Sequence, residues 1–574
     1  MAAAAALGAA AAMVTVFPGC DGSRRTSPPS GNRGTGSDRA PRIGQTDPQR
    51  CDDLLDQAVN MLQPDRLGIS AERKLAVGRL NEWAIQCGNG DADADADELP
   101  PEFGALLPEG VRALLADAHF SGRDCNHVRT AFLFQRTLDF VTAGADDDLS
   151  RTVKLFDHVV RTVELVERRP DDLPLTPYEI MLFGKGTAED RAWVFVGMVR
   201  QMRLDAVIVR PAAAAGGDPA ATGHASAAGP GAFLVGVLLE ENVHLFDPRV
   251  GTPVPGDDDD GKSLFVKVPA TWDAAARNPE LLGRLSVPAA AGSSVQAPDL
   301  ESPRIELVGD SSVWAPRMKR LQSGLAGELS AVIYDPLLGA GGESGMVSRV
   351  AEAGRGRWDR DAISVWQYPE QQLAAFEALD EQRPHELQRW LKAPFPIVGI
   401  SRDFEPRYGA PDNELLKNRT EHLLGDLTHA ITKYTGLRGL ERALVTGRDP
   451  QTRQQFVLPE AGRAELQRRI PSQYREIHRR AAEQAHYWLG LAQYQNGQHA
   501  AAAGTLTSYL DVHGAGSWAR AARELRSICL AESGQVAAAL AELRELAERD
   551  PEHPGRAEIE WLIRRWEAIQ DGTR

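Results

Sequence analysis

The sequence predicts an α+β fold, in which a mainly helical multidomain chain carries a small sheet near its middle. With 574 residues, the chain is longer than one hydrophobic core usually serves, and about three or four domains are expected. Apolar residues recur at helical spacing before residue 170 and again after residue 413. Between these regions, short apolar runs bounded by turn residues predict strands. A helix followed by a run of strands is typical of the α+β class.

Charge and apolar patterning argue against two classes of partner. Lys and Arg total 64 while Asp and Glu total 80, which gives a formal net charge of −16 without a basic face. We therefore expect no nucleic-acid partner. Beyond residue 20 no apolar run reaches about 18 residues, so we expect no internal membrane span. The sequence has no Walker-type glycine loop, no HExxH motif and no paired zinc cysteines, so we expect no cofactor and no metal.

Residues 1–49 are interpreted as a signal-like segment followed by a disordered tether. Met1–Gly19 is almost wholly Ala, Val, Leu and Gly, and Cys20 follows directly. This pattern resembles a bacterial lipoprotein signal, in which the cysteine after a small residue becomes the lipidated start of the mature protein. The resemblance implies lipidation of Cys20 and an extracytoplasmic protein attached to a membrane. The usual basic start is missing, because the first positive side chain is Arg24. If the signal does not function, the protein is cytoplasmic.

Residues 50–170 form the predicted N-terminal helical region. Asp52–Leu62 and Ser70–Gln86 both have helical apolar spacing and flank a turn, which predicts a helical hairpin. Cys51 opens the first helix and Cys87 closes the second, and antiparallel packing brings these ends together. In an oxidising compartment a Cys51–Cys87 disulfide is therefore expected, with two separate buried thiols as the alternative.

Residues 171–270 contain a helix followed by strands. The apolar spacing of Thr187–Arg203 predicts the helix. Runs of β-forming residues predict four strands, at Ala206–Val209, Phe233–Leu239, Val243–Phe246 and Leu264–Val268. Residues 271–412 are a mixed region for which the sequence predicts no fold.

Residues 413–574 are predicted to be helical, with a repeat visible in their small residues. Three pairs of Gly and Ala are each five residues apart, namely Gly425 and Ala430, Gly497 and Ala502, and Gly534 and Ala539. This spacing resembles tetratricopeptide repeats, in which Gly ends the first helix of a pair and Ala lets the second pack closely. The resemblance is good over residues 480–555, whereas the copy near Gly425 is isolated. It implies two or three stacked units that bind a protein or peptide along a concave face.

The segment Gly186–Arg200 resembles the nucleophile helix of the transglutaminase-like superfamily. In that family a cysteine begins the helix, with an alanine and an arginine at fixed positions further along. Ala192 and Arg200 fit this frame, which puts Ala188 at the cysteine position. Because a methyl group cannot act as a nucleophile, the resemblance implies a papain-like α+β core over residues 171–270 that does not catalyse.

The rest of the family's catalytic signature is a strand that starts with His, followed by an Asp in an Asp-Pro step. Asp247 and Pro248 match that step, and counting fifteen residues back places Ala232 at the histidine position. Two of the three triad positions are therefore alanine, and Asp247 has no imidazole to orient. His224 imitates the histidine motif within an Ala/Gly insert, and His244 is expected on the exposed side of its strand.

Two further stretches carry the resemblance. Leu245–Gly256 and Val313–Met318 are similar to segments of a group of large bacterial transglutaminase-like proteins. Members of that group combine the core with N-terminal helices and a C-terminal TPR-like region. They look non-catalytic at the same cysteine.

A rival nucleophile is Cys125, which is followed by an amide and then by His127. Neighbouring residues on a helix project about 100° apart, so adjacency in sequence is not a catalytic arrangement. The alternative interpretation is a core cysteine beside a surface histidine. A displaced catalytic set would join Cys125 to His224 or His244 and to Asp247.

Two functional hypotheses follow. In the first, the chain is a non-catalytic, exported binding or scaffold protein whose transglutaminase-like core and TPR-like helices bind a protein or peptide. In the second, it is a cysteine peptidase or acyl-transferase of the same superfamily that uses a displaced nucleophile.

Overall fold

The structure is a computed structural model that describes residues 48–66, 70–87, 102–169, 172–211, 231–287, 295–339, 344–379, 397–400, 406–408, 414–438, 446–448, 455–457, 465 and 468–572. The chain divides into two units, Met1–Asp47 and Pro48–Arg574. The predicted lipidation site Cys20 and the histidine candidate His224 lie outside the described residues, so both stay predictions.

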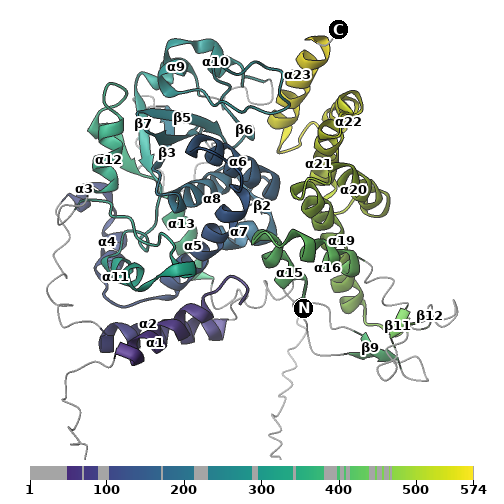
Figure 1. Cartoon of the computed structure of the whole chain (residues 1–574), viewed down its shortest axis with the longest axis horizontal. Coiled ribbons are helices and arrows are strands. Elements are labelled where there is room, and N and C mark those ends of the chain that lie inside the picture. The colour runs from purple at the N-terminus through teal and green to yellow at the C-terminus, as the bar shows by residue number, and fades with distance from the viewer. Residues whose placement is uncertain are drawn as a thin grey trace, which may run out of the picture. The chain divides into compact units, whose positions relative to one another are not determined.

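A mixed six-stranded sheet lies at the centre of the second unit, which is mainly helical (Figure 1). Its strands in spatial order are β6 (Thr252–Pro253), β5 (Asn242–Asp247), β4 (Leu234–Leu239), β3 (Ala206–Pro211), β7 (Pro303–Leu307) and β8 (Ile363–Val365). Neighbours are antiparallel except for β7 and β8, which are parallel. The predicted strand at residues 206–209 and the predicted hairpin are confirmed.

The strand predicted at Leu264–Val268 is wrong. Strand pairing next to this segment is limited to an isolated bridge between Pro255, which follows β6, and Pro269. Proline has no N–H to donate, so three prolines, which include Pro253, prevent a continuous ladder. The mixed region after residue 270, in contrast, supplies β7 and β8 to this same sheet.

Side chains of the sheet alternate between two cores, one on each face. On β3, Ala206 and Ile208 pack in the core that contains helix α8 (Ala188–Gln201), whereas Val207 and Val209 pack in the core on the other face. The α8 side is formed mainly by α5 (Gly122–Val141), α6 (Asp148–Thr162), α7 (Pro177–Phe183) and α8 itself, and α13 (Tyr368–Ala378) and α15 (Glu414–Leu423) add Leu373, Leu416 and Leu423. Because both faces are covered, most residues of the six strands are buried.

Helix α8 begins and packs as its sequence dictates. Thr187 accepts a hydrogen bond from the Asp190 amide while the Asp190 carboxylate accepts one from the Thr187 amide, which is a capping box. Gly197 lets α8 cross α5 closely, since a Cβ there would lie 2.6 Å from Phe134. The rings of Phe156, Phe195 and Phe246 then join α6, α8 and β5, with centroids 5.0 to 5.2 Å apart.

Other helices cover the opposite face of the sheet and form the N-terminal region. These are α1 (Pro48–Met61), α2 (Ser70–Cys87), α3 (Phe103–Leu106), α4 (Glu109–Ala116), α9 (Trp272–Arg277), α10 (Pro279–Gly283), α11 (Pro316–Gly324) and α12 (Met346–Ala353). The described part of the chain also contains the 3₁₀ turns η3 (Ala297–Leu300), η4 (Gly327–Leu329) and η5 (Arg360–Ala362).

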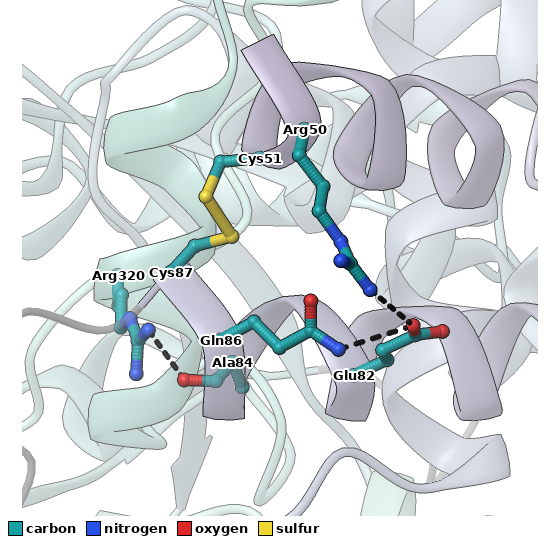
Figure 2. The surroundings of a disulfide bond; sticks show 7 residues. All are labelled: Arg50, Cys51, Glu82, Ala84, Gln86, Cys87 and Arg320. Carbon is teal, nitrogen blue, oxygen red and sulfur yellow. Dashed lines mark hydrogen bonds and ion pairs between the residues drawn. A yellow bond between two sulfur atoms is a disulfide. The ribbon is translucent and has the colours of Figure 1, made fainter. Parts of the chain in front are cut away.

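The predicted helical hairpin is formed by α1 and α2, and the structure joins Cys51 to Cys87 in a disulfide (Figure 2). Their Cα atoms lie 5.6 Å apart, within the usual range for disulfides. Arg320 of α11 ties the hairpin to the body, because it donates to the Ala84 carbonyl at 2.7 Å and lies over the Trp83 ring.

The C-terminal region is a run of packed helices (Figure 1). They are α15 (Glu414–Leu423), α16 (Leu427–Leu437), α19 (Ser472–Gln495), α20 (His499–His513), α21 (Ala519–Glu532), α22 (Val536–Arg549) and α23 (Arg556–Gly572). Short strand pairs lie elsewhere, with β1 (Glu164–Leu165) parallel to β2 (Lys185–Gly186), β9 (Ile397–Ile400) antiparallel to β10 (Pro406–Tyr408), and β11 (Thr446–Arg448) antiparallel to β12 (Gln455–Val457).

Each glycine of the predicted repeat adopts a left-handed conformation where one helix of a pair ends. Gly425, Gly497 and Gly534 have φ of 89°, 71° and 80°, a region that glycine enters without steric cost. The three matching alanines, Ala430, Ala502 and Ala539, are fully buried. A larger side chain at these positions would separate the paired helices.

The copy near Gly425, which is isolated in the sequence, packs against the next copy in the structure. Helix α16 packs against α19, where Tyr434 and Trp488 lie with ring centroids 6.1 Å apart. The sequence separates the two copies by a long insertion, but folding places them side by side. None of the described helices is long and apolar enough to cross a membrane.

Candidate functional site

The start of α8, where the resemblance places a nucleophile, is filled by the chain's own side chains. Ala188 is only 5% exposed. The Asp190 carboxylate accepts hydrogen bonds from the Thr187 amide at 2.9 Å and from Arg168 at 2.9 Å. Its other oxygen accepts one from the Tyr368 hydroxyl at 2.8 Å. The helix N-terminus that would stabilise a thiolate therefore already holds a carboxylate.

Aromatic rings close this end of α8. Tyr368 stacks on Trp366 with centroids 5.0 Å apart and lies edge-on to Trp193 at 6.2 Å. Burial, followed by the nearby charge of Asp190, raises the pKa of the Tyr368 hydroxyl, which stays protonated and donates. Ala188 does not line any of three cavities among the described residues, with volumes of about 40, 30 and 470 Å³.

Asp247 holds a turn rather than an imidazole. Its Oδ1 accepts hydrogen bonds from the amides of Arg249 and Val250, both at 2.9 Å. Burial raises the pKa of its carboxyl group, and those two amide bonds oppose the shift. The Asp247–Pro248 step lies close to α8, because Arg191 donates a hydrogen bond to the Pro248 carbonyl at 3.2 Å.

The two alanines at the degenerate positions belong to different cores. Ala188 packs in the core on the α8 side, whereas Ala232 packs against the core on the other face of the sheet. Strand alternation explains this arrangement, because residues two apart share a face and Ala232 is two residues from Leu234 of that other core. The structure therefore does not gather these positions into one cluster.

His244 is buried, at 8% exposed, and not on an exposed strand face as predicted. It pairs across the sheet with Val237 and forms a bridge to Thr271, so neighbouring segments cover it. Burial lowers the pKa of its imidazole. The prediction assumed a sheet with one solvated face, whereas this sheet is packed on both.

Cys125 lies in the core at 1% exposed, and burial raises the pKa of its thiol to about 12. A thiol with this pKa is protonated at neutral pH and is a poor nucleophile. His127, which was predicted at the surface, is mostly buried in the structure. Its Nε2 lies 2.9 Å from the Ile333 carbonyl, and its Nδ1 is 3.9 Å from Asp310.

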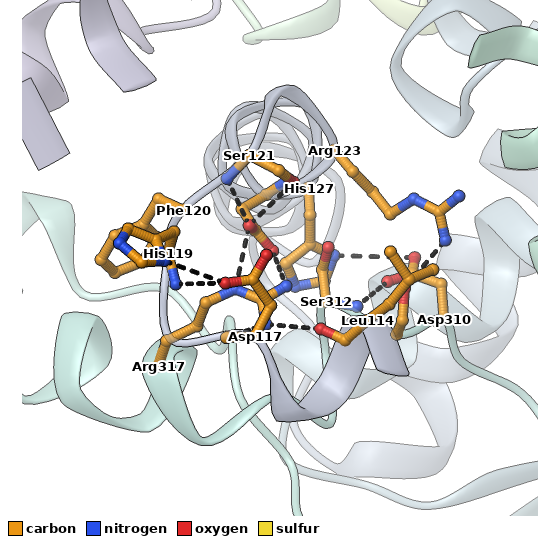
Figure 3. Close-up of polar contacts among 12 residues, drawn as sticks. Leu114, Asp117, His119, Phe120, Ser121, Arg123, His127, Asp310, Ser312 and Arg317 are labelled. Atoms are coloured by element: carbon orange, nitrogen blue, oxygen red, sulfur yellow. Dashed lines mark hydrogen bonds and ion pairs between the residues drawn. The ribbon is translucent and has the colours of Figure 1, made fainter. Parts of the chain in front are cut away.

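The polar side chains near Cys125 connect helices (Figure 3). Arg317 forms two hydrogen bonds to the Asp124 carboxylate at 2.8 and 3.0 Å and donates to the carbonyls of Leu114 and Asp117. Asp310 accepts from the Ser312 amide at 2.9 Å. The cavity beside them has a volume of about 40 Å³, which suits a water molecule and not a substrate.

The first helix of each C-terminal pair faces the sheet-containing part of the unit. Arg419 of α15 donates to the carbonyls of Met181 and Leu182, and Gln495 of α19 donates to Thr162. Just before α21, the Ser517 carbonyl accepts from Lys185. The helix face that a repeat array would offer to a partner is thus largely occupied by this chain itself.

A cluster of charged side chains also joins the C-terminal helices to the sheet-containing part of the unit. Arg161 of α6 donates to Glu558 of α23 and to Asp157, and lies 3.7 Å from Glu524 of α21. Arg191 of α8 lies 3.7 Å from Glu558. Burial and the neighbouring Glu558 raise the pKa of Glu524. A cavity of about 30 Å³ lies beside the cluster.

An open groove of about 470 Å³ remains between α6, α19 and α23, and we call it the α6–α19–α23 groove. Its apolar lining includes Phe140, Val153, Phe156, Phe265, Tyr494, Trp561 and Leu562. Its polar lining includes Lys154, Asp157, His158, Thr252, Lys267, Gln495 and His499. This volume lies in the range of about 300 to 1,000 Å³ that ligand sites usually occupy.

Sequence reasoning missed the groove. Its lining spans residues 140 to 562, from four separate segments. No local sequence motif marks such a site. The turn at Gly497 was the one local feature within its lining that the sequence predicted, and it was already explained as part of the repeat.

The described residues contain no group of three or more His, Cys, Asp or Glu side chains that could hold a metal ion. Comparison of the chain with protein-family models, curated proteins and solved structures finds no match. The resemblance to transglutaminase-like and TPR-like proteins therefore rests on the sequence patterns alone.

Proposed function

We propose that this chain is a non-catalytic binding or scaffold protein in which a transglutaminase-like core and TPR-like helices together hold a protein or peptide partner. The observation that carries the proposal is the α6–α19–α23 groove, which is open and lined from both parts of the chain. The position of the family's nucleophile, in contrast, is a buried alanine.

The family positions that are retained have structural roles. Ala192 is fully buried within the α8-side core. Arg200 donates to the Val308 carbonyl and so ties α8 to the end of β7. Neither role requires a nucleophile. Both therefore support the proposal that the family's fold is retained without its catalytic activity.

The C-terminal helices support the TPR-like interpretation. In each of three pairs a left-handed glycine ends the first helix and a buried alanine lies in the second. Because the first helices face the core, the partner has access to that face only where the groove is open.

We further propose that the protein is exported and that Cys20 is lipidated, which would attach it to a membrane. The Cys51–Cys87 disulfide supports export, because disulfides persist mainly in oxidising compartments. Intact-mass analysis of the natively expressed protein tests this. Diacylation at Cys20 is expected, and an unprocessed N-terminus would contradict it.

Site-specific photo-crosslinking in the native host tests binding. A photoreactive amino acid at Val153, within the groove, should give an adduct with a partner. The control is Val512 of α20, which is 62% exposed and outside the groove, and should give none. Equal adducts at both positions, or none at Val153, would count against the groove.

Thiol labelling tests the absence of catalysis. Cys125 and Cys529 are the free cysteines among the described residues, and both are buried. We expect neither to react with a chloroacetamide probe in the folded protein and both to react in urea. Fast labelling of Cys125 in the folded state would instead support a cysteine peptidase or acyl-transferase.

A further inference from the structure

We propose that the α6–α19–α23 groove takes an extended peptide segment in which a carboxylate lies next to a bulky apolar side chain. This inference rests on the proposed binding function and specifies its ligand. Three features of the groove carry it, namely its aromatic floor, its excess of positive charge and its polar side chains.

The floor is apolar and held in place by internal contacts. Phe265 lies edge-on to Trp566 with centroids 6.4 Å apart, and the Arg161 guanidinium lies 5.5 Å from the Phe265 ring. Trp561 is buried beside them. A rigid aromatic floor can bury an apolar side chain of a ligand with little ordering cost.

The charge of the groove is positive although the chain has a net charge of −16. Among the lining residues, Arg161 offsets only one of the two carboxylates Asp157 and Glu558. Burial lowers the pKa of His158 to about 3, so that ring is neutral. The exposed lysines Lys154 and Lys267 then leave an excess of positive charge at the rim, which favours an acidic group on the ligand.

Polar side chains favour a peptide over an apolar acid such as a fatty acid. Thr252, Gln495 and His499 line the groove beside its apolar residues. The main-chain groups of a peptide can form hydrogen bonds to such side chains, whereas a hydrocarbon chain cannot. The Nδ1 atom of His499 is buried without a hydrogen-bond partner among the described residues.

Fluorescence anisotropy with labelled, end-blocked tetrapeptides tests the inference. The peptides share a central Phe-Leu pair and carry Glu, Gln or Lys at both ends. With two lysines at the rim, we expect the Glu peptide to bind at least about tenfold more tightly than the Lys peptide. Equal affinities, or no binding of any of the three, would overturn the inference.

Charge reversal supplies the matched variants. The double change Lys154→Glu and Lys267→Glu should reverse the order of the Glu and Lys peptides. Lys262→Glu is the control, because Lys262 is an exposed lysine of the same loop that does not line the groove. Thermal melting of each variant checks that it folds. If the double variant still preferred the Glu peptide to the Lys peptide, the peptides would bind outside the α6–α19–α23 groove.

The two levels of the proposal can fail separately. An adduct at Val153 without any preference among the peptides would overturn the ligand class and keep the binding function. Palmitate that binds the groove where the Glu peptide does not would replace the peptide with a lipid. Failure of both the adduct and the peptides would overturn both levels.

Discussion

Arg161 of α6 donates a hydrogen bond to the carboxylate of Glu558 of α23, across 397 residues of sequence. Their side chains are 5% and 1% exposed. Gly251 makes room for this contact, because a Cβ there would lie 2.5 Å from Glu558. The pair links the last helix to the sheet-containing region and forms part of the wall of the α6–α19–α23 groove.

Removal of one member of this pair should be strongly destabilising. Glu558→Gln would leave Arg161 buried without its main carboxylate, and we expect a loss of about 3 kcal/mol. The double variant Arg161→Met and Glu558→Met should lose less than the sum of these two single changes, since each single change leaves the other member of the pair buried without its partner. Urea unfolding of the wild type, the two single Met variants and the double variant measures this coupling.

The matched control is an exposed ion pair, Arg544 with Glu567, whose side chains are 53% and 41% exposed. Arg544→Gln should cost less than about 1 kcal/mol, because solvent screens the pair. Equal losses at the buried and exposed pairs would contradict the role given to Glu558.

Left-handed glycines of the repeat should resist substitution to different degrees. Gly497→Ala meets no atom within 4 Å, so its expected cost of about 1 kcal/mol comes from backbone conformation alone. Gly425→Ala should cost more, because its Cβ would lie 2.6 Å from Phe140. The melting temperatures of the variants rank the two effects.

A helical glycine provides the opposite control. Gly504 lies within α20 and has no positive φ, and a Cβ added there would meet no atom within 4 Å. Gly504→Ala should stabilise by about 0.5 to 1 kcal/mol, because alanine has the higher helix propensity. A loss at Gly504 equal to that at Gly497 would contradict the conformational explanation.

His158 should make stability depend on pH. Burial lowers the pKa of its imidazole to about 3, whereas it titrates near about 6.5 in the unfolded chain. Below that value the unfolded state binds a proton that the folded state does not, so stability falls as pH falls. His158→Gln removes this group, and the variant should lose less stability than the wild type between pH 7 and pH 5.

Comparing how much stability the wild type and the His158→Gln variant each lose between pH 7 and pH 5 separates the effect of His158 from that of the buried acids. Glu524 and Glu164 have raised pKa values, which shift stability in the opposite direction on acidification. They are present in both proteins and cancel in the difference. Urea midpoints at the two pH values give the slopes, and equal slopes would refute the assignment.

The disulfide should stabilise the N-terminal hairpin. Cys51 and Cys87 are 36 residues apart, and a closed loop of this size is worth about 4 kcal/mol in the chain-entropy model. Cys51→Ser with Cys87→Ser should therefore increase proteolysis between α1 and α2. Cys529→Ser is the control, since Cys529 has a free thiol. An unchanged cleavage rate would contradict a structural role.

Several elements could be predicted because their signals are local. The helix at residues 187–203, the hairpin of β4 and β5, and the glycine turns each follow from apolar periodicity or from the conformational needs of one residue. The Cys51–Cys87 pairing followed from the geometry of one helical hairpin. For the candidate site, the sequence predicted Ala188 in place of a nucleophile but did not predict the groove.

The sequence by itself determined which residues can do chemistry and where single helices and turns begin and end. Only the tertiary structure decided that His244 is buried, that β7 and β8 complete the sheet, and that Arg161 meets Glu558. These outcomes depend on contacts between segments that lie tens to hundreds of residues apart. Local propensity carries no information on such contacts, because they form only when separate apolar faces find a common partner.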